Sequence, residues 1–269
     1  MSERRRHDVT GRECQAAALL AAARLARGPI PPLPEACRPA TEDEGYRVQE
    51  ALHRALAPAL GPVAGHKIGC TTPVMQAYLG IASPCAGGVL ATTVHHGSAR
   101  LRHADYRRVG VECEIAVRLG ADLVRAPRER AHLRDAVAEC LVAMEIVDDR
   151  YADFRTVGVP TLIADDFFGA GCVLGEPVSG WRTLELAALA GVTRVNGVER
   201  GRGVGGAVMG DPLAALAWLA ERRDSLDLGL RAGEFVLLGS LVETCWLDPG
   251  DRASVAIEGL GEVEATFLA

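Results

Sequence analysis

The stretch "VGVECEIAVRLG", residues 109–120, alternates in the two-residue period of a β-strand, so its side chains divide between two faces. One face is apolar: Val109, Val111, Cys113, Ile115, Val117 and Leu119. The other face carries Glu112 and Glu114, and strand geometry places such neighbours roughly 7 Å apart. Two carboxylates at this spacing reach a single cation. For an isolated pair, the commoner alternative is a solvated face with Arg118 as the local counter-ion.

A second acidic stretch makes the cation site the better hypothesis. In "CLVAMEIVDDRYADF", residues 140–154, Glu145 directly follows an apolar run. A carboxylate there is costly unless it is ion-paired or bound to a metal. If Glu145 faces Glu112 and Glu114, three carboxylates converge, which suits Mg²⁺ or Mn²⁺. The alternative is a structural salt bridge between the acidic residues of this stretch and Arg150.

A third stretch, "GHKIGCTTP" at residues 65–73, predicts a buried strand that contains Lys67. Buried lysines often have a lowered pKa, which suits acid–base chemistry. A surface lysine at the end of a strand is the alternative.

Composition excludes several classes of protein. Among 269 residues 49% are hydrophobic, which is enough for a sizeable core. The net charge of −6 and the pI near 5.7 argue against binding to nucleic acids or anionic membranes. No run of about 18 apolar residues occurs, so we expect no membrane span. The eight cysteines form no C-x-x-C pair, which argues against zinc and iron–sulfur sites.

The N-terminal "AAALLAAARLA", residues 16–26, resembles a secretory signal only superficially. Arg24 and Arg27 fall at helical spacing and interrupt the apolar run, so the pattern favours an amphipathic helix of a cytoplasmic protein. Scattered cysteines in apolar contexts fit the same reducing compartment.

The chain divides into an N-terminal helical segment, residues 1–60, and a β-rich body, residues 61–269, that we expect to form one structural domain. Helices are predicted at 13–27 and 41–60, the second with a capping box of Thr41 and Glu44, and a third helix follows Asp211. Strands are predicted at 64–69, 110–119, 138–147, 171–175, 192–196 and 234–239, with a closing hairpin at 254–267. Strands and helices do not alternate regularly, so an α+β fold is favoured over a Rossmann fold. The "GRGVGG" of residues 201–206 lacks the strand–turn–helix context of a dinucleotide site and predicts a glycine-rich loop.

The order of these motifs is similar to that of a known family. "GHKIGCT", "VGVECEIAVRLGADL", "MEIVDDRYADF", "TLIADDFFGAGCVLG", "GDPLAALAWLA", "RAGEFVLLGSLVETCWLDPGD" and "IEGLGEVEATF" together resemble the 2-keto-4-pentenoate hydratase group of the fumarylacetoacetate hydrolase superfamily. The similarity runs from about residue 45 to the end of the chain.

The resemblance implies a mixed β-roll or barrel in which Glu112, Glu114 and Glu145 hold Mg²⁺ or Mn²⁺. It also implies that Lys67 and Asp165 move protons. Candidate substrate-binding residues are Thr71, Arg150 and Ser240. The implied activity is the addition of water to a 2-hydroxy-2,4-dienoate, the enol form of a small 2-keto acid that arises in aromatic catabolism. The implied assembly is a homo-oligomer, at least a dimer.

Two related chemistries and one non-catalytic role stay open. The same centre would serve decarboxylation of a 2-oxo-3-enedioate, or C–C hydrolysis of a diketo acid. Hydrolases of the superfamily use a His–Glu pair on a lid, for which this chain offers only His95 and His96 nearby. Three positions depart from the hydratase pattern: Cys85 replaces an acid, Asp166 an asparagine and Leu238 a threonine. These departures keep a non-catalytic partner subunit among the alternatives.

Overall fold

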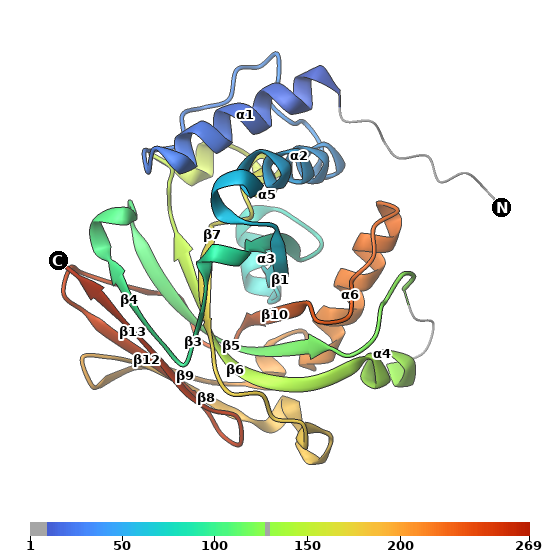
Figure 1. The fold of residues 1–269 in the computed structure, drawn as a ribbon, viewed down its shortest axis with the longest axis vertical. Helices are drawn as coiled ribbons and strands as arrows, with labels where there is room; N and C mark the ends of the chain where they lie inside the picture. Colours follow the sequence, from blue (N-terminus) through green and yellow to red (C-terminus); the bar gives the residue numbers. More distant parts are fainter. Residues whose placement is uncertain (1–9, 127–129) are drawn as a thin grey trace.

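The computed structural model describes residues 10–126 and 130–269. Within them, strands of a larger and a smaller β-sheet contact each other, and α-helices cover one end (Figure 1). The predicted α+β class is confirmed. Its α-helices are α1 (Gly11–Leu25), α2 (Glu42–Leu60), α3 (Pro73–Leu79), α4 (Arg130–Ala136), α5 (Val159–Ala164) and α6 (Pro212–Ser225). Short 3₁₀ turns lie at η1 (Ala91–Thr93), η2 (His103–Asp105), η3 (Phe154–Thr156), η4 (Trp181–Thr183), η5 (Leu186–Ala188) and η6 (Gly205–Ala207).

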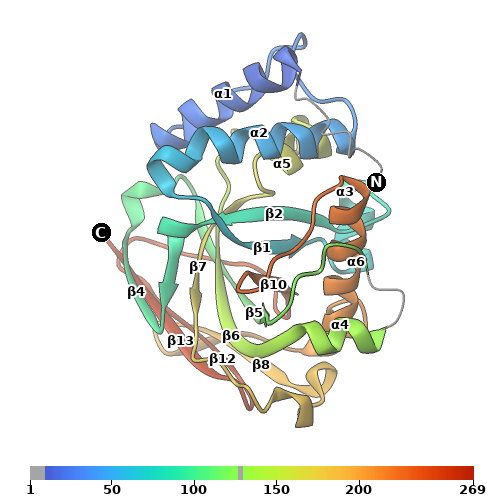
Figure 2. The same ribbon diagram turned by 45° about the vertical axis from the view of Figure 1, so that its right-hand side comes forward.

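The larger sheet has eight strands within the described residues, in the order β2-β1-β10-β5-β6-β7-β3, with β11 paired to β5. Its strands are β1 (Val63–Gly69), β2 (Cys85–Leu90), β3 (Val94–His96), β5 (Val109–Leu119), β6 (Val137–Asp148), β7 (Gly169–Leu174), β10 (Phe235–Ser240) and β11 (Cys245–Trp246). Although β2 and β7 stand far apart in this order, they contact each other, so the sheet is strongly curved (Figure 2). The predicted β-roll is therefore confirmed, and no closed barrel forms in the described part of the chain.

The smaller sheet has five strands in the described ranges, in the order β4-β13-β12-β8-β9. They are β4 (Ser98–Arg102), β8 (Ala190–Val195), β9 (Val198–Val204), β12 (Arg252–Ile257) and β13 (Gly261–Leu268). The predicted closing hairpin is β12 with β13, and the predicted Asn196–Gly197 turn joins β8 to β9. Both turn residues have positive φ, +52° and +78°, as a tight hairpin turn requires.

The glycine-rich loop predicted at 201–206 is wrong for its first four residues, because Gly201–Val204 belong to β9. A Cβ on Gly203 would lie 1.8 Å from the backbone oxygen of Leu241, and one on Gly201 would lie 2.2 Å from a methyl of Val242. The glycines thus let β9 approach this neighbouring backbone, which residue preferences alone do not reveal.

The helical layer at the top of Figure 1 consists of α1, α2 and α5, which contact one another through α2. Helix α2 begins where the sequence predicts, because the Oγ1 of Thr41 accepts a hydrogen bond from Glu44 N at 3.2 Å. Helix α1 begins at Gly11, two residues before its predicted start, and α5 was not predicted. The reciprocal half of the predicted capping box is absent: Glu44 Oε2 instead accepts from Ala40 N at 2.6 Å. The predicted start of α6 is confirmed, since Asp211 Oδ1 accepts from Leu213 N at 2.9 Å.

No described helix combines the length and the apolar character needed to cross a membrane. The sequence-based division of the chain at residue 60 stays a prediction, although α2 packs directly on β2 and α5 of the body.

Candidate metal centre

Glu112, Glu114 and Glu145 converge in the structure. Strands β5 and β6 pair antiparallel with Glu112 directly opposite Glu145, and Glu114 follows two residues later on the same face. One carboxylate oxygen of each residue lies within 4.8 Å of one from each of the others. Glu114 and Glu145 are fully buried, and Glu112 is half-buried. The alternative of a solvated face paired with Arg118 is excluded, because Arg118 contacts Glu139 instead.

Each carboxylate is held by one polar neighbour on a different element. Glu114 Oε2 accepts from Gly239 N at 2.8 Å, Glu112 Oε1 accepts from the hydroxyl of Thr244, and Glu145 Oε1 lies 3.1 Å from Lys67 Nζ. Two further oxygens, Glu114 Oε1 and Glu145 Oε2, are buried and have no hydrogen-bond partner among the described residues. Buried, unpartnered carboxylate oxygens that face one another are what a hard divalent cation requires, so the donor set fits Mg²⁺ or Mn²⁺.

The crowded charges perturb these groups. Burial, together with the charges of Glu145 and Glu112, raises the pKa of Glu114 well above its ordinary value. Burial raises the pKa of Glu145 to about 7, against the opposing effect of Lys67. Burial alone would lower the pKa of Lys67, but the three carboxylates outweigh it and raise that pKa. The predicted lowering of the Lys67 pKa is therefore wrong when only the three carboxylates surround it, since they stabilise the ammonium form.

Lys67 lies in the middle of β1 and is only 3% exposed, which excludes the surface alternative. Its Nζ also donates to the backbone oxygen of Phe167 at 3.1 Å and lies 5.4 Å from the centre of the Phe167 ring. Lys67 is the only lysine in a chain whose lysines and arginines number 29. The other 28 are arginines, so the single lysine is a further signal in the sequence.

Asp165 and Arg150 form a buried ion pair. Arg150 Nε and Nη2 donate to Asp165 Oδ2 at 3.0 and 2.9 Å, and the hydroxyl of Tyr151 donates to the same oxygen at 3.2 Å. Arg150 Nη2 also donates to the backbone oxygens of Asp165 and Gly169. Arg150 thus forms a structural salt bridge, but with Asp165 and not with the acidic residues of its own stretch, as the alternative had it. A role for Asp165 in proton transfer, and for Arg150 in substrate binding, stays a prediction.

Thr71 and Ser240 border the glutamates. Ser240 is paired with Glu114 across β10 and β5. Thr71 is buried, and a Cβ on Gly239 would lie 2.6 Å from its Cγ2. Gly239 has φ +117°, so a glycine is needed both for this backbone conformation and for the contact that places its N–H on Glu114. A substrate role for both residues stays a prediction.

The residues that depart from the hydratase pattern have different surroundings. Leu238 is fully buried in the main apolar core, and Cys85 is buried at the start of β2. Asp166 is fully buried, and its carboxylate contacts Arg24 Nη1 at 2.7 Å and His53 Nε2 at 2.6 Å. In the sequence, Arg24 only interrupts an apolar run, and His53 has no distinctive neighbours. Neither position indicates its contact with Asp166, which lies more than a hundred residues away.

His95 and His96, the candidates for a hydrolase pair, lie on the edge strand β3, paired with Val173 and Leu174 of β7. Burial lowers the pKa of His95.

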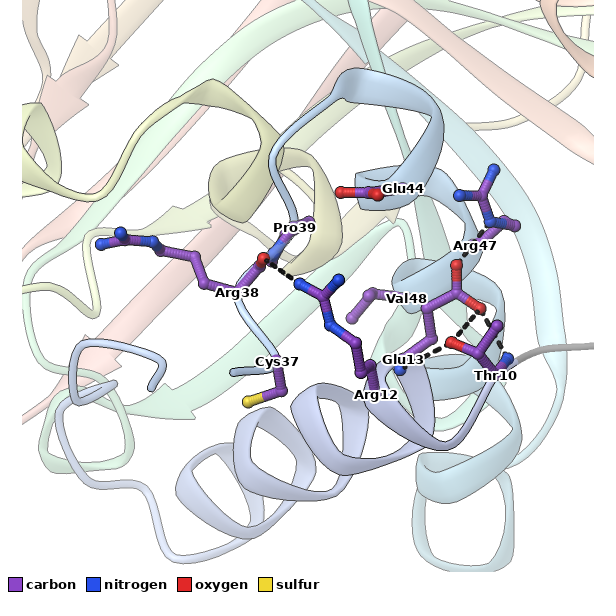
Figure 3. A pocket seen from close by; sticks show the side chains of 9 residues that line it. All are labelled: Thr10, Arg12, Glu13, Cys37, Arg38, Pro39, Glu44, Arg47 and Val48. Carbon is purple, nitrogen blue, oxygen red and sulfur yellow. Dashed lines mark hydrogen bonds and ion pairs between the residues drawn. The ribbon is translucent and has the colours of Figure 1, made fainter. Parts of the chain in front are cut away.

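Two surface cavities lie away from the glutamates. One, of about 180 Å³, is formed by the starts of α1 and α2 and the connector between them, with Arg12, Glu13, Arg38 and Arg47 among its lining residues (Figure 3). The other, of about 220 Å³, is lined by residues including His53, His66 and Arg223. Neither includes Glu112, Glu114 or Glu145.

Comparison with known proteins identifies the family. Residues 88–268 match the model of the fumarylacetoacetate (FAA) hydrolase C-terminal domain. The chain is 36% identical over 251 residues to a 2-keto-4-pentenoate hydratase of Paraburkholderia phymatum, covering 93% of this chain and 95% of the relative. The chain belongs to the fumarylacetoacetate hydrolase family.

Other members of the fumarylacetoacetate hydrolase family agree with this placement. A 2-hydroxyhexa-2,4-dienoate hydratase of Comamonas testosteroni is 30% identical over 257 residues, 95% of this chain and 97% of its own. In fold, the chain matches a 4-oxalocrotonate decarboxylase of Pseudomonas putida G7, complexed with magnesium and adipate, with a TM-score of 0.89, 24% identity and coverage of 95% and 97%. The family resemblance expected from the sequence motifs is confirmed, within the group of 2-keto-4-pentenoate hydratases.

Proposed function

We propose that this protein is a divalent-metal-dependent hydratase that adds water to a 2-hydroxy-2,4-dienoate and yields a 4-hydroxy-2-keto acid. The observation that carries the proposal is the buried trio of Glu112, Glu114 and Glu145, in a chain whose relatives over nearly their whole length are named hydratases of such acids. In this reading the chain acts in the catabolism of aromatic ring-cleavage products.

The three glutamates would hold Mg²⁺ or Mn²⁺. When bound, the cation supplies Lewis acidity at the C1 carboxylate and C2 oxygen of the substrate, where negative charge develops. The remaining chemistry is proton transfer. In ketonisation the enol proton leaves the C2 oxygen and a proton is added at C5. In hydration, the oxygen of water bonds to C4 and a proton is added at C3.

We assign the proton transfers to Lys67, since it is buried beside Glu145 and no other lysine occurs in the sequence. General acid–base help of this kind contributes roughly 10²–10⁴-fold to the rate. Asp165 is the proposed second proton-transfer residue, and Arg150 holds its Oδ2. Thr71 and Ser240, which border Glu114 and Gly239, are the proposed contacts to the substrate.

Decarboxylation of a 2-oxo-3-enedioate is the second candidate. It is favoured by the fold match to a 4-oxalocrotonate decarboxylase, which extends over 95% of the chain. Both reactions pass through the same dienol chemistry at C2, so the glutamates and Lys67 would serve either one. The difference lies in what happens at the distal end of the substrate.

The deciding experiment follows the ultraviolet absorbance of 2-hydroxypenta-2,4-dienoate with Mg²⁺ or Mn²⁺, and again after chelation. We expect the dienol absorbance to be lost only with metal, and mass spectrometry to detect a product heavier by one water. Release of CO₂ from 4-oxalocrotonate in place of hydration would favour the decarboxylase. Unchanged turnover in metal-free protein, or in Glu112→Gln, would contradict both activities.

The proposed setting is the cytoplasm, where a reducing medium suits eight cysteines that are all free. We also propose a homo-oligomer. It is supported by the apolar side chains that α3 exposes, Val74, Met75 and Tyr78. Light scattering of the purified protein tests the assembly, and a monomeric mass would contradict it.

A further inference from the structure

The surroundings of Lys67 extend beyond the glutamates. Its Nζ divides its contacts between Glu145 and the backbone oxygen of Phe167, each at 3.1 Å. Its aliphatic part passes along the same segment, because a Cβ on Gly169 would lie 3.8 Å from Lys67 Cγ. The turn at residues 166–169 therefore forms one wall against which Lys67 rests.

This turn has an unfavourable backbone conformation. Asp166, Phe167 and Phe168 are consecutive non-glycine residues with φ of +58°, +47° and +68°. A non-glycine residue in this region costs about 1 kcal/mol or more, so three in succession persist only where their surroundings fix them. Whatever fixes the turn also fixes the carbonyl that accepts a hydrogen bond from Lys67.

The side chain of Asp166 is anchored from three elements. Its Oδ2 accepts from Arg24 Nη1 of α1 at 2.7 Å, and its Oδ1 contacts His53 Nε2 of α2 at 2.6 Å and accepts from Gly88 N of β2 at 2.8 Å. Arg24 Nη2 also donates to the backbone oxygen of Gly169 at 3.4 Å, so this guanidinium contacts both ends of the turn.

We propose that Arg24 and His53 are positioning residues for Lys67. By fixing Asp166, they hold the turn in its left-handed conformation, and the carbonyl of Phe167 then keeps Lys67 Nζ against Glu145. The N-terminal helices thereby contribute to the geometry of the centre without contacting the glutamates or Lys67, and Arg24 Nη1 also lies 3.6 Å from Asp165 Oδ1. The hydratase pattern has an asparagine at position 166. In this chain Asp166 carries a negative charge there, and Arg24 and His53 are basic partners for it.

The test uses the single lysine. Reductive methylation with formaldehyde and cyanoborohydride modifies only Lys67 and the α-amino group. Mass spectrometry of proteolytic peptides measures the two sites separately, so the α-amino group serves as internal reference. In the wild type Lys67 should react slowly. In Arg24→Gln and in His53→Ala we expect its rate to rise about tenfold, as for the loss of one buried hydrogen bond to a charged group. His53→Gln retains a donor to Asp166 and should restore protection.

The matched control is Arg47→Gln. It removes the ion pair between Arg47 of α2 and Glu13 of α1 but does not contact the turn. If Lys67 is methylated as fast in Arg47→Gln as in Arg24→Gln, any loosening of the helical layer is enough to expose Lys67. That result would overturn the proposal. Unchanged Lys67 protection in Arg24→Gln would overturn it as well. If Arg24→Gln does not fold, the contrast between His53→Ala and His53→Gln decides the question alone.

The activity measurement rests on the proposed function and is kept separate. In His53→Ala, which removes a contact to Asp166 and none to Asp165, we expect kcat to fall about a hundredfold, as for a reacting group displaced by about an ångström, with KM and the Mg²⁺ affinity from calorimetry within about twofold of wild type. A parallel loss of Mg²⁺ affinity would indicate general disruption and contradict positioning. If the wild type has no hydratase activity while the labelling pattern holds, the proposed function fails and the positioning of Lys67 stands.

Discussion

Glu112 of β5 and Glu145 of β6 are direct cross-strand partners, so their side chains leave the sheet on the same face. Side chains paired in this way have Cβ atoms only about 5 Å apart. A half-buried and a fully buried carboxylate in that position repel each other, and Glu114 adds a third, buried carboxyl group. Lys67 offsets one of these negative charges, and the remaining repulsion favours the binding of a further cation.

Replacing Glu114 by glutamine should remove stabilisation by metal. For the wild type, Mg²⁺ at about 100 times its Kd should add about 2.7 kcal/mol to the free energy of unfolding. Thermal denaturation with and without MgCl₂ measures this gain. In Glu114→Gln we expect the gain to vanish, while the metal-free variant is at least as stable as the wild type, since one buried like charge is gone. Glu139→Gln, on the neighbouring strand β6 and paired with Arg118, should keep the full gain.

Replacing Lys67 should separate charge from proton transfer. In Lys67→Met, kcat is expected to fall by about 10²–10⁴-fold, because the proton-transfer group is lost, while calorimetry still detects Mg²⁺ binding. Lys67→Arg keeps the positive charge but not a readily transferred proton, so it should be nearly as inactive. Turnover close to wild type in Lys67→Arg would show that the charge alone is sufficient.

Gly239→Ala, a substitution in the neighbouring strand β10, should weaken metal binding by the glutamates. Its Cβ would overlap Thr71, and the backbone at φ +117° would move, which displaces the N–H that donates to Glu114. We expect a loss of stability of about 2–3 kcal/mol from combined strain and overlap, together with weaker Mg²⁺ binding. Gly250→Ala, at φ +92° with no heavy atom within 4 Å, reports the cost of backbone strain alone. Equal effects of the two substitutions on Mg²⁺ affinity would disprove the steric explanation.

Asp166 should make the fold sensitive to acid. Burial opposes ionisation of Asp166, but His53, Arg24 and the N–H of Gly88 together lower its pKa far below the ordinary 3.8. A lowered folded-state pKa contributes stability that is present above pH 4 and is lost as the pH falls further. Asp166→Asn should therefore be less stable than the wild type by about 3 kcal/mol at pH 7, because Arg24 loses its shorter buried ion pair and keeps only the one to Asp165 at 3.6 Å. Urea denaturation between pH 7 and pH 3 should show the two proteins converging, and a constant difference would refute this account.

The three glutamates could be picked out from the sequence, because the patterns that mark them lie in the residues next to them. The alternation of residues 109–119 determines which side chains share a face, and the apolar run before Glu145 marks it as an acid in a buried strand. The structure adds the register, which no local pattern specifies. A shift of one residue between β5 and β6 would have placed Glu145 on the opposite face from Glu112.

The network around Asp166 was not predictable, and β2 shows why. No strand was predicted at residues 85–90, since "CAGGVL" contains two glycines. A Cβ on Gly87 would lie 2.6 Å from the backbone oxygen of Asp166, and one on Gly88 would lie 2.6 Å from His53. Both glycines are needed because Asp166 and His53, which are distant in sequence, lie so close to them. The same two glycines make residues 85–90 look unlike a strand in the sequence.

Strand β5 is hydrogen-bonded to β6 along one edge and to β10 and β11 along the other. Its amide hydrogens should consequently exchange with deuterium only when the whole sheet opens. The peptide groups that carry Glu112 and Glu114 thus belong to the most slowly exchanging part of the molecule. Fraying of α1 or α3 would leave Glu112 and Glu114 in place, so the proposed cation binding should persist through such local opening.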